Sequence, residues 1–213
     1  MKTMRNLLVI GALLTGWRSG MAAPQAPAMM AMRADQVRTW LWAHEAWSFE
    51  GRLWVLAGPH RGNGRFNWKQ FNRRVYHLDM TAPITGKRWQ LSGDTHYEGG
   101  TLTGLDSGPI DGEIASILFQ DTTGLDIPVS ELPDWIRAMP AWDTQFPANK
   151  ITHDAAGRVR TIRQMGCLIR YKAYHEATDD RPAMPKQIDL NCGDVPLRFS
   201  IDRWDVPKPE IAE

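Results

Sequence analysis

The sequence has no excess of charge of one sign and no long hydrophobic run. Its 213 residues carry 25 Lys and Arg against 24 Asp and Glu, which gives a formal net charge of +1. This balance creates no global basic field, so no nucleic-acid partner is expected. The main apolar run, 7–14, is too short to cross a bilayer as a helix. The 43% hydrophobic content argues against disorder and supports a packed core.

Groups that usually carry chemistry are also scarce. The six histidines are scattered, and none pairs with a cysteine or glutamate at the spacing of a zinc site. No Ser, His and Asp constellation and no phosphate-binding glycine loop stands out. We therefore expect no catalytic residue, no metal and no cofactor, and a protein that is not an enzyme.

The N-terminus reads as a targeting segment. Lys2 and Arg5 precede the apolar run, which has the length and position of the core of a signal peptide. The run ends Leu14-Thr15-Gly16-Trp17, which fits the lipobox of a bacterial lipoprotein except that Trp17 replaces the cysteine that is lipidated. We predict a degenerate lipoprotein signal over 1–22 and a flexible Ala-, Pro- and Met-rich tether over 23–34. A plain secretory signal is the alternative.

The rest of the chain is dominated by alternating apolar and polar residues. Short strands are expected at 49–56, 65–69, 75–80, 89–91, 95–97, 101–105, 150–153, 159–165, 167–174, 186–192 and 197–204. Helices are expected after Asp35, over 111–120 with Asp111 as its cap, and over 130–138 with Ser130 as its cap. About eleven strands in hairpin order with about three helices predict a mainly β fold over 35–206. The expected architecture is an unclosed antiparallel barrel with a helical lid, followed by a tail over 207–213.

The two cysteines of the chain lie in neighbouring predicted strands. If positions in the hairpin 167–192 pair so that Tyr171 faces Ile188, then Cys167 faces Cys192. An exported protein can form this disulfide. Two buried thiols are the alternative, because directly opposed cysteines still need suitable geometry.

Six segments of the chain form an ordered set of motifs: Phe49-Glu50-Gly51-Arg52-Leu53, 64–70, the proline loop 82–86, 127–136, Pro182-Ala183-Met184-Pro185 and Ile201-Asp202-Arg203-Trp204. No single motif is diagnostic, but their order and spacing over about 35–206 are specific. Together these segments resemble the LolB family, the outer-membrane lipoprotein receptors of the Lol pathway.

The resemblance implies a binding protein with a LolA/LolB-like half-barrel. Such a protein accepts acylated lipoproteins from a LolA-type periplasmic carrier, holds their acyl chains in an apolar cavity and incorporates them into the outer membrane. The expected location is the periplasmic face of the outer membrane, and the expected state is a monomer. Because Trp17 cannot carry a lipid, a soluble periplasmic carrier of lipoproteins or other apolar ligands is the alternative. A third interpretation is an envelope assembly factor without an acyl ligand.

The residues suggest where cargo and membrane would be contacted. In the LolB family the loop at 82–86 carries a protruding apolar residue implicated in membrane delivery, and Ile84 matches it between Pro83 and Gly86. A lone exposed isoleucine also needs no special explanation. Cys167 stands where the family tends to have a tryptophan. Nine apolar and aromatic side chains are expected to contact acyl chains: Leu53, Val55, Phe66, Trp68, Tyr76, Leu78, Trp89, Trp135 and Ile136. Ordinary packing in the core is the alternative for each of them.

Overall fold

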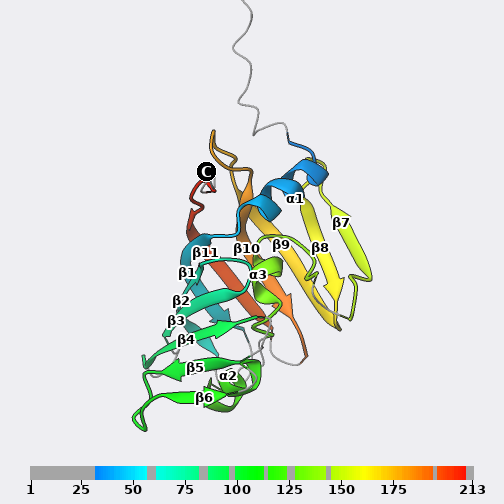
Figure 1. Cartoon of the computed structure of the whole chain (residues 1–213). Coiled ribbons are helices and arrows are strands. Elements are labelled where there is room, and N and C mark those ends of the chain that lie inside the picture. Colours follow the sequence, from blue (N-terminus) through cyan, green and yellow to red (C-terminus); the bar gives the residue numbers. More distant parts are fainter. Residues whose placement is uncertain are drawn as a thin grey trace, which may run out of the picture.

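The strands of this protein form one antiparallel sheet (Figure 1). The computed structural model describes residues 32–56, 61–81, 86–95, 99–112, 115–123, 128–142, 145–193 and 196–209. Eleven strands make up the sheet, and three helices accompany it. The strands are β1 (Trp47–Val55), β2 (Gly62–Gln70), β3 (Val75–Thr81), β4 (Arg88–Asp94), β5 (Gly100–Thr103), β6 (Ile110–Gly112), β7 (Lys150–His153), β8 (Val159–Gln164), β9 (Cys167–His175), β10 (Met184–Asn191) and β11 (Leu197–Asp205).

The chain enters the sheet at its middle and leaves it there. β1 pairs with β11, so the strand order is β6-β5-β4-β3-β2-β1-β11-β10-β9-β8-β7. The chain therefore runs outward to β6, crosses over through the helices, and returns inward from β7. β6 and β7 end the sheet on opposite sides and are not paired with each other, which confirms the predicted unclosed antiparallel architecture.

Alternation along the strands decides which face becomes the core. In β1 the side chains of Trp47, Phe49, Leu53 and Val55 are buried, while Glu50 and Arg52 between them are exposed. The same period of two recurs in neighbouring strands, so the buried positions line up on one face of the sheet. The aromatic residues of this face stack on one another, as in the pair Trp68 and Tyr76 with ring centroids 4.7 Å apart.

Gly51 lies where the two central strands β1 and β11 approach each other closely. The register between β1 and β11 shifts between Glu50 and Gly51. A Cβ atom at position 51 would lie 2.4 Å from the carbonyl oxygen of Ser200, a contact that no side chain allows. A residue without a side chain is therefore needed where the two strands meet.

The helices differ in their limits from the sequence prediction. α1 covers Ala34–Ala43, α2 Ala115–Thr123 and α3 Leu132–Ile136. Asp35 does not cap α1: it lies inside the first turn, and the backbone N–H of Arg33 is bound by the side chain of Gln36. Asp111 does not cap α2 either, because it lies in β6 and accepts a hydrogen bond from Thr101 Oγ1 across the strand pair (2.6 Å).

The third helix is shorter than predicted. Ser130 lies in a turn rather than at the helix cap, because the backbone N–H groups of Glu131 and Leu132 both bond to the carbonyl oxygen of Pro128. The strand predicted at 95–97 is wrong at its first residue, because Thr95 lies in a turn. Positions 96 and 97 lie outside the described residues. The eleventh strand is β6 instead.

Some of the predicted segments lie outside the described residues. These are the signal peptide over 1–22, including Trp17, and the tether up to residue 31. Among the described residues, no helix has both the length and the apolar character needed to span a membrane.

Candidate functional site

An apolar cavity lies between α1 and the strands β7–β9. Its volume is about 510 Å³, within the roughly 300–1,000 Å³ usual for small-molecule sites. α1 supplies Val37 and Leu41, and the sheet supplies Ile151, Val159 and Tyr174. The remaining apolar lining comes from the start of α1 and the residue two positions before it, the chain after α3, the β7–β8 turn and the chain between β9 and β10: Met32, Ala34, Ala138, Met139, Pro140, Ala156, Gly157, Ala177, Pro182 and Ala183.

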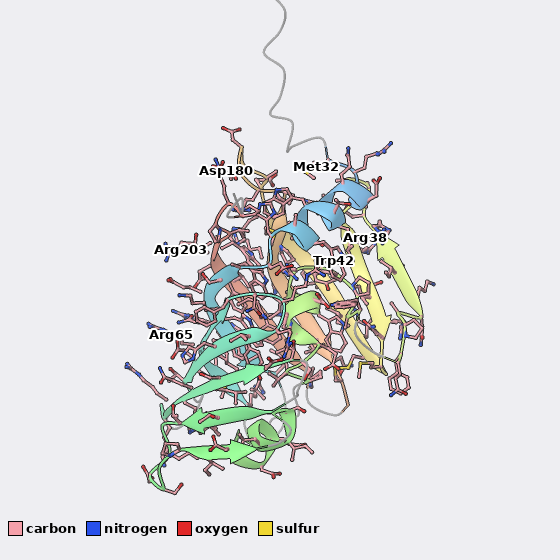
Figure 2. All side chains as sticks on the ribbon, in the orientation of Figure 1. Met32, Arg38, Trp42, Arg65, Asp180 and Arg203 are labelled. Carbon is pink, nitrogen blue, oxygen red and sulfur yellow. A yellow bond between two sulfur atoms is a disulfide. The ribbon has the colours of Figure 1, made fainter. Side chains whose placement is uncertain are left out.

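The roof of this cavity is the amphipathic helix α1. Val37 and Leu41 are four residues apart, so they share one face of the helix, and Leu41 is only 4% exposed. The helix ends at His44, whose backbone N–H and Nδ1 both contact the carbonyl oxygen of Trp40. In Figure 2, Met32 lies just before α1, Arg38 lies within the helix, and Trp42 lies near its end.

α3 is held against the sheet by buried polar contacts of Trp135. The indole Nε1 of Trp135 donates a hydrogen bond to Gln164 Oε1 on β8 (2.9 Å). The hydroxyl of Tyr171 on β9 donates to the carbonyl oxygen of Trp135 (2.6 Å). Burial raises the pKa of Tyr171 well above its ordinary value, so this hydroxyl stays protonated and remains a donor.

Gln164 also fixes the chain that follows α3. Its side chain is fully buried. Besides Trp135, its Oε1 accepts a hydrogen bond from the backbone N–H of Ala141 (2.9 Å), and its Nε2 donates to the carbonyl oxygens of Ala141 (2.7 Å) and Phe146 (2.9 Å). Because Met139 and Pro140 immediately precede Ala141 and line the cavity, Gln164 sets the position of one cavity wall.

Arg137 joins α3 to α1. Its Nη1 donates hydrogen bonds to the carbonyl oxygens of Leu41 (2.9 Å) and His44 (3.2 Å), and its Nε donates to Pro133 (3.1 Å). Nη2 lies 3.4 Å from Asp134 Oδ1. Burial lowers the pKa of Arg137 to about 10, and burial also raises the pKa of Asp134 despite the nearby guanidinium. Arg137 is therefore charged at neutral pH and held by several acceptors.

Charged side chains surround the mouth of the cavity. Exposed residues of both signs contribute to its lining: Asp35, Arg38, His153 and Glu176. Arg158 is held in place by Asp154 (2.8 Å) and lies over the ring of Tyr174. Arg137, which is buried, also belongs to the lining. A largely apolar interior with a charged mouth suits a ligand that has a hydrocarbon chain and a polar end. Within the described ranges, no three His, Cys, Asp or Glu side chains converge as metal ligands.

The side chains predicted to contact acyl chains lie elsewhere, most of them on the sheet and two of them, Trp135 and Ile136, on α3. None of them lines the cavity beneath α1. Trp89 is half-buried, and its indole Nε1 is buried without a hydrogen-bond partner among the described residues. Trp135 borders a second cavity of about 320 Å³ next to Cys167 and Cys192. The others are almost completely buried in the core, and their contact with a ligand stays a prediction: Leu53, Val55, Phe66, Trp68, Tyr76, Leu78 and Ile136.

Packing explains this difference. Alternation identifies the buried face of the sheet but does not show which part of that face is filled by its own side chains and which part leaves a cavity. On the β1–β4 side, large rings fill the space, as Phe66 does against Phe199 with centroids 5.1 Å apart. On the β7–β9 side, smaller residues such as Val159 leave room beneath α1. The sequence feature that could have indicated this cavity is the pair Val37 and Leu41. The two residues share one apolar face of a helix, and such a face has to pack against another apolar surface.

Of the predicted membrane-delivery loop, only its end is described. Pro83 and Ile84 lie outside the described residues, between β3 and β4. Gly86 has a φ of +67° in the left-handed region, where a side chain is strained even though open space surrounds it. The backbone conformation at Gly86 therefore favours glycine at this position.

The two cysteines face each other across β9 and β10. The strand register pairs Tyr171 with Ile188 and Ile169 with Leu190, which agrees with the predicted pairing. The structure joins Cys167 and Cys192 by a disulfide. The bridge closes the end of the β9–β10 hairpin beside α3.

Comparisons with known proteins agree on one family. The family model described as "Outer membrane lipoprotein LolB" matches residues 45–204. Proteins named "Outer-membrane lipoprotein LolB" from Xanthomonas oryzae pv. oryzae, Xanthomonas campestris pv. campestris and Xylella fastidiosa are 34%, 36% and 31% identical to this chain. The alignments cover 96%, 95% and 93% of this chain and 98%, 97% and 91% of those relatives.

The fold is shared with a solved structure of low sequence similarity. A LolA superfamily protein from Nitrosomonas europaea superimposes with a TM-score of 0.50 at 9% identity, covering 83% of this chain and 94% of that one. At this identity the likeness concerns the fold alone. The match of the family model over most of the sheet, together with full-length relatives above 30% identity, shows that this chain belongs to the LolB family.

Proposed function

We propose that this chain receives acylated lipoproteins from a LolA-type periplasmic carrier and delivers them to the outer membrane. The observation that carries this proposal is the apolar cavity of about 510 Å³ beneath α1, in a chain of the LolB family. The cavity supplies a site for hydrocarbon chains, and its charged mouth leaves the polar part of a lipoprotein in contact with water.

Transfer of an acyl chain between two apolar cavities needs no nucleotide. Moving one CH₂ group from water into an apolar site gains about 0.8 kcal/mol, so a long chain is strongly retained once it is sheltered. When both the carrier and the receptor offer an apolar site, most of this free energy cancels. A small difference in affinity between the two cavities then sets the direction of transfer.

A binding role fits the polar groups around the cavity better than a catalytic one. The side chains of Arg137 and Gln164 are buried, and their hydrogen bonds go to backbone and side-chain groups of α1, α3 and the chain after α3. These groups hold the roof and wall of the cavity. We therefore propose that the protein acts without chemical conversion of its cargo.

The proposed place of action is the periplasmic face of the outer membrane, where the protein works as a monomer. Trp17 stands at the lipobox position and has no thiol, so the chain as written cannot carry a thioether-linked lipid there. Contact with the membrane would then depend on the protein itself, with the loop 82–86 as the proposed delivery element. Sedimentation of the purified protein tests the monomer directly.

The test of the function is binding of an apolar fluorophore and its displacement by a triacylated peptide. Val37→Trp places a large ring in the cavity from α1 and should weaken binding of both ligands at least tenfold. Thr39→Trp is the matched control, because Thr39 is exposed on the same helix and does not line the cavity. Equal binding by the wild type and both variants would contradict the proposed site, and a fluorophore that the peptide cannot displace would contradict the proposed cargo.

A further inference from the structure

β7 ends the sheet on the side of the cavity. One of its edges pairs with β8, and no other strand of the described part pairs with its outer edge. Figure 1 shows β7 at the margin of the sheet, with α1 lying across the neighbouring strands. An edge strand of this kind presents backbone N–H and C=O groups that can pair with another extended chain.

The same strand forms part of the cavity. Ile151 and His153 lie two residues apart, so their side chains share one face of β7, and both line the cavity. Thr152 points to the opposite face, where its hydroxyl lies 2.6 Å from that of Thr161. Ile151 is 37% exposed, so part of this apolar side chain is left uncovered at the edge of the cavity. A ligand in the cavity therefore lies directly beside the free edge.

The other terminal strand provides a contrast. β6 is the opposite end of the sheet, it contributes no residue to this cavity, and α2 packs against it and its neighbours. Only the edge at β7 therefore combines an available backbone with an adjoining apolar site in the described part of the chain.

We propose that β7 binds the cargo polypeptide itself, by main-chain hydrogen bonds to the extended segment that follows the acylated residue. This inference rests on the proposed function, because it places the acyl chains in the cavity beneath α1. The acyl chains and the peptide are covalently joined, so filling the cavity brings the peptide to its mouth. Backbone pairing suits a receptor whose cargoes share an acylated N-terminus but differ in sequence, because main-chain hydrogen bonds do not depend on the identity of the side chains.

The register of β7 limits how much peptide can pair. Lys150, Ile151 and Thr152 follow one regular register with β8, which shifts between Thr152 and His153. The backbone N–H of Asn149 extends the ladder by bonding to the carbonyl oxygen of Arg163 (2.8 Å). A segment of about four residues can therefore pair with β7, and only alternate peptide N–H groups of that segment would point toward it.

The test is a scan of triacylated peptides in which single backbone amides are N-methylated, one position at a time. Removing an N–H that bonds to β7 should weaken binding roughly three- to tenfold, while removing one that faces away should leave it unchanged. The expected result is a loss that alternates with a period of two over the residues after the acylated one. An unacylated peptide, which lacks the acyl chains, and a fatty acid, which lacks the peptide, serve as control ligands.

Amide hydrogen exchange of the protein gives a second readout. Binding of the triacylated peptide should slow exchange of outward-facing amides of β7, and β6 is the internal control whose amides should not change. The fatty acid alone should leave both edges unchanged. Equal affinity of all methylated peptides together with unaltered exchange in β7 would overturn the backbone pairing while leaving cargo binding intact. Failure of every acylated peptide to bind would instead overturn the proposed function, and this inference with it.

Discussion

The guanidinium of Arg137 donates a hydrogen bond of 2.9 Å to the carbonyl oxygen of Leu41, which lies 96 residues away in the sequence. Leu41 lines the cavity, so this bond ties α3 to the cavity roof. The carbonyl groups in the last turn of a helix have no partner within that helix, and a cation beside them is favourable. Arg137 therefore caps α1 from a different element.

We expect Arg137→Met to loosen α1 and to destabilise the fold. The substitution removes a buried cation, leaves the carbonyl oxygens of Leu41 and His44 without this donor, and leaves Asp134 without its charge partner. Loss of one member of a buried pair costs about 3–5 kcal/mol. Chemical denaturation measures this cost, and stopped-flow release of a bound fluorophore should become faster because the roof is less firmly held.

Two further variants control this experiment. Arg203→Met removes an exposed arginine that pairs with Glu50, and because water screens surface pairs of this kind, its loss should change the stability little. The double variant Arg137→Met with Asp134→Leu should recover part of the stability, because no unpaired carboxylate remains. If Arg137→Met behaves like Arg203→Met, then Arg137 does not hold the roof.

We expect Gln164→Leu to cost at least about 2 kcal/mol in the free energy of unfolding. Leucine fills a similar volume, but the indole of Trp135 and the backbone of Ala141 lose their buried partners. Gln90→Leu is the control, since Gln90 is exposed and bonds to Asp79 on the sheet surface. Denaturation of both variants under identical conditions separates the two cases, and equal stabilities would show that the Gln164 contacts add nothing.

The sequence predicted the sheet well because its information there is local. Alternation places Phe49 and Leu53 on one face, and the hairpin register that opposes Cys167 and Cys192 follows from two neighbouring strands. Caps were less predictable, because Asp111 is as suitable for a strand pair with Thr101 as for a helix start. A single aspartate in the sequence does not show whether it will cap a helix or bond across a pair of strands.

The cavity depends on contacts between distant segments, which is why its residues were missed. Its roof comes from α1, its wall from the chain near Met139, and its floor from β7–β9. Arg137 and Gln164, which hold these parts together, have no periodic pattern that marks them in the sequence. Large aromatic residues such as Trp68 are typical of ligand-binding sites, but in the opposite half of the sheet they pack against each other instead.

We expect Ile84→Asp to impair delivery without impairing acceptance. Burial of one isoleucine in a membrane gains about 1.5–3 kcal/mol, and a carboxylate resists entering the apolar layer. A two-step reconstitution scores transfer from the carrier and incorporation into vesicles separately, with Ile84→Leu as the control that keeps an apolar side chain. A parallel loss in both steps, or no loss in either, would remove Ile84 as a delivery element.

We expect Trp17→Cys to restore lipid modification, because it completes the lipobox around Leu14, Thr15 and Gly16. Metabolic labelling with palmitate should mark the variant and leave the wild type unlabelled. Mass spectrometry of the wild-type N-terminus should find no lipid and a mature chain that begins near Ala23. A labelled wild-type protein would show that acylation occurs at another residue.

Photo-crosslinking tests the location of the cargo most directly. A triacylated peptide with a diazirine at the end of one acyl chain is bound, irradiated, and the modified residues are identified by mass spectrometry. If acyl chains occupy the cavity beneath α1, the label will be found on its inner lining, such as Leu41, Met139 and Val159. Labelling of the β1–β4 core around Phe66 and Trp68, with none beneath α1, would contradict this account.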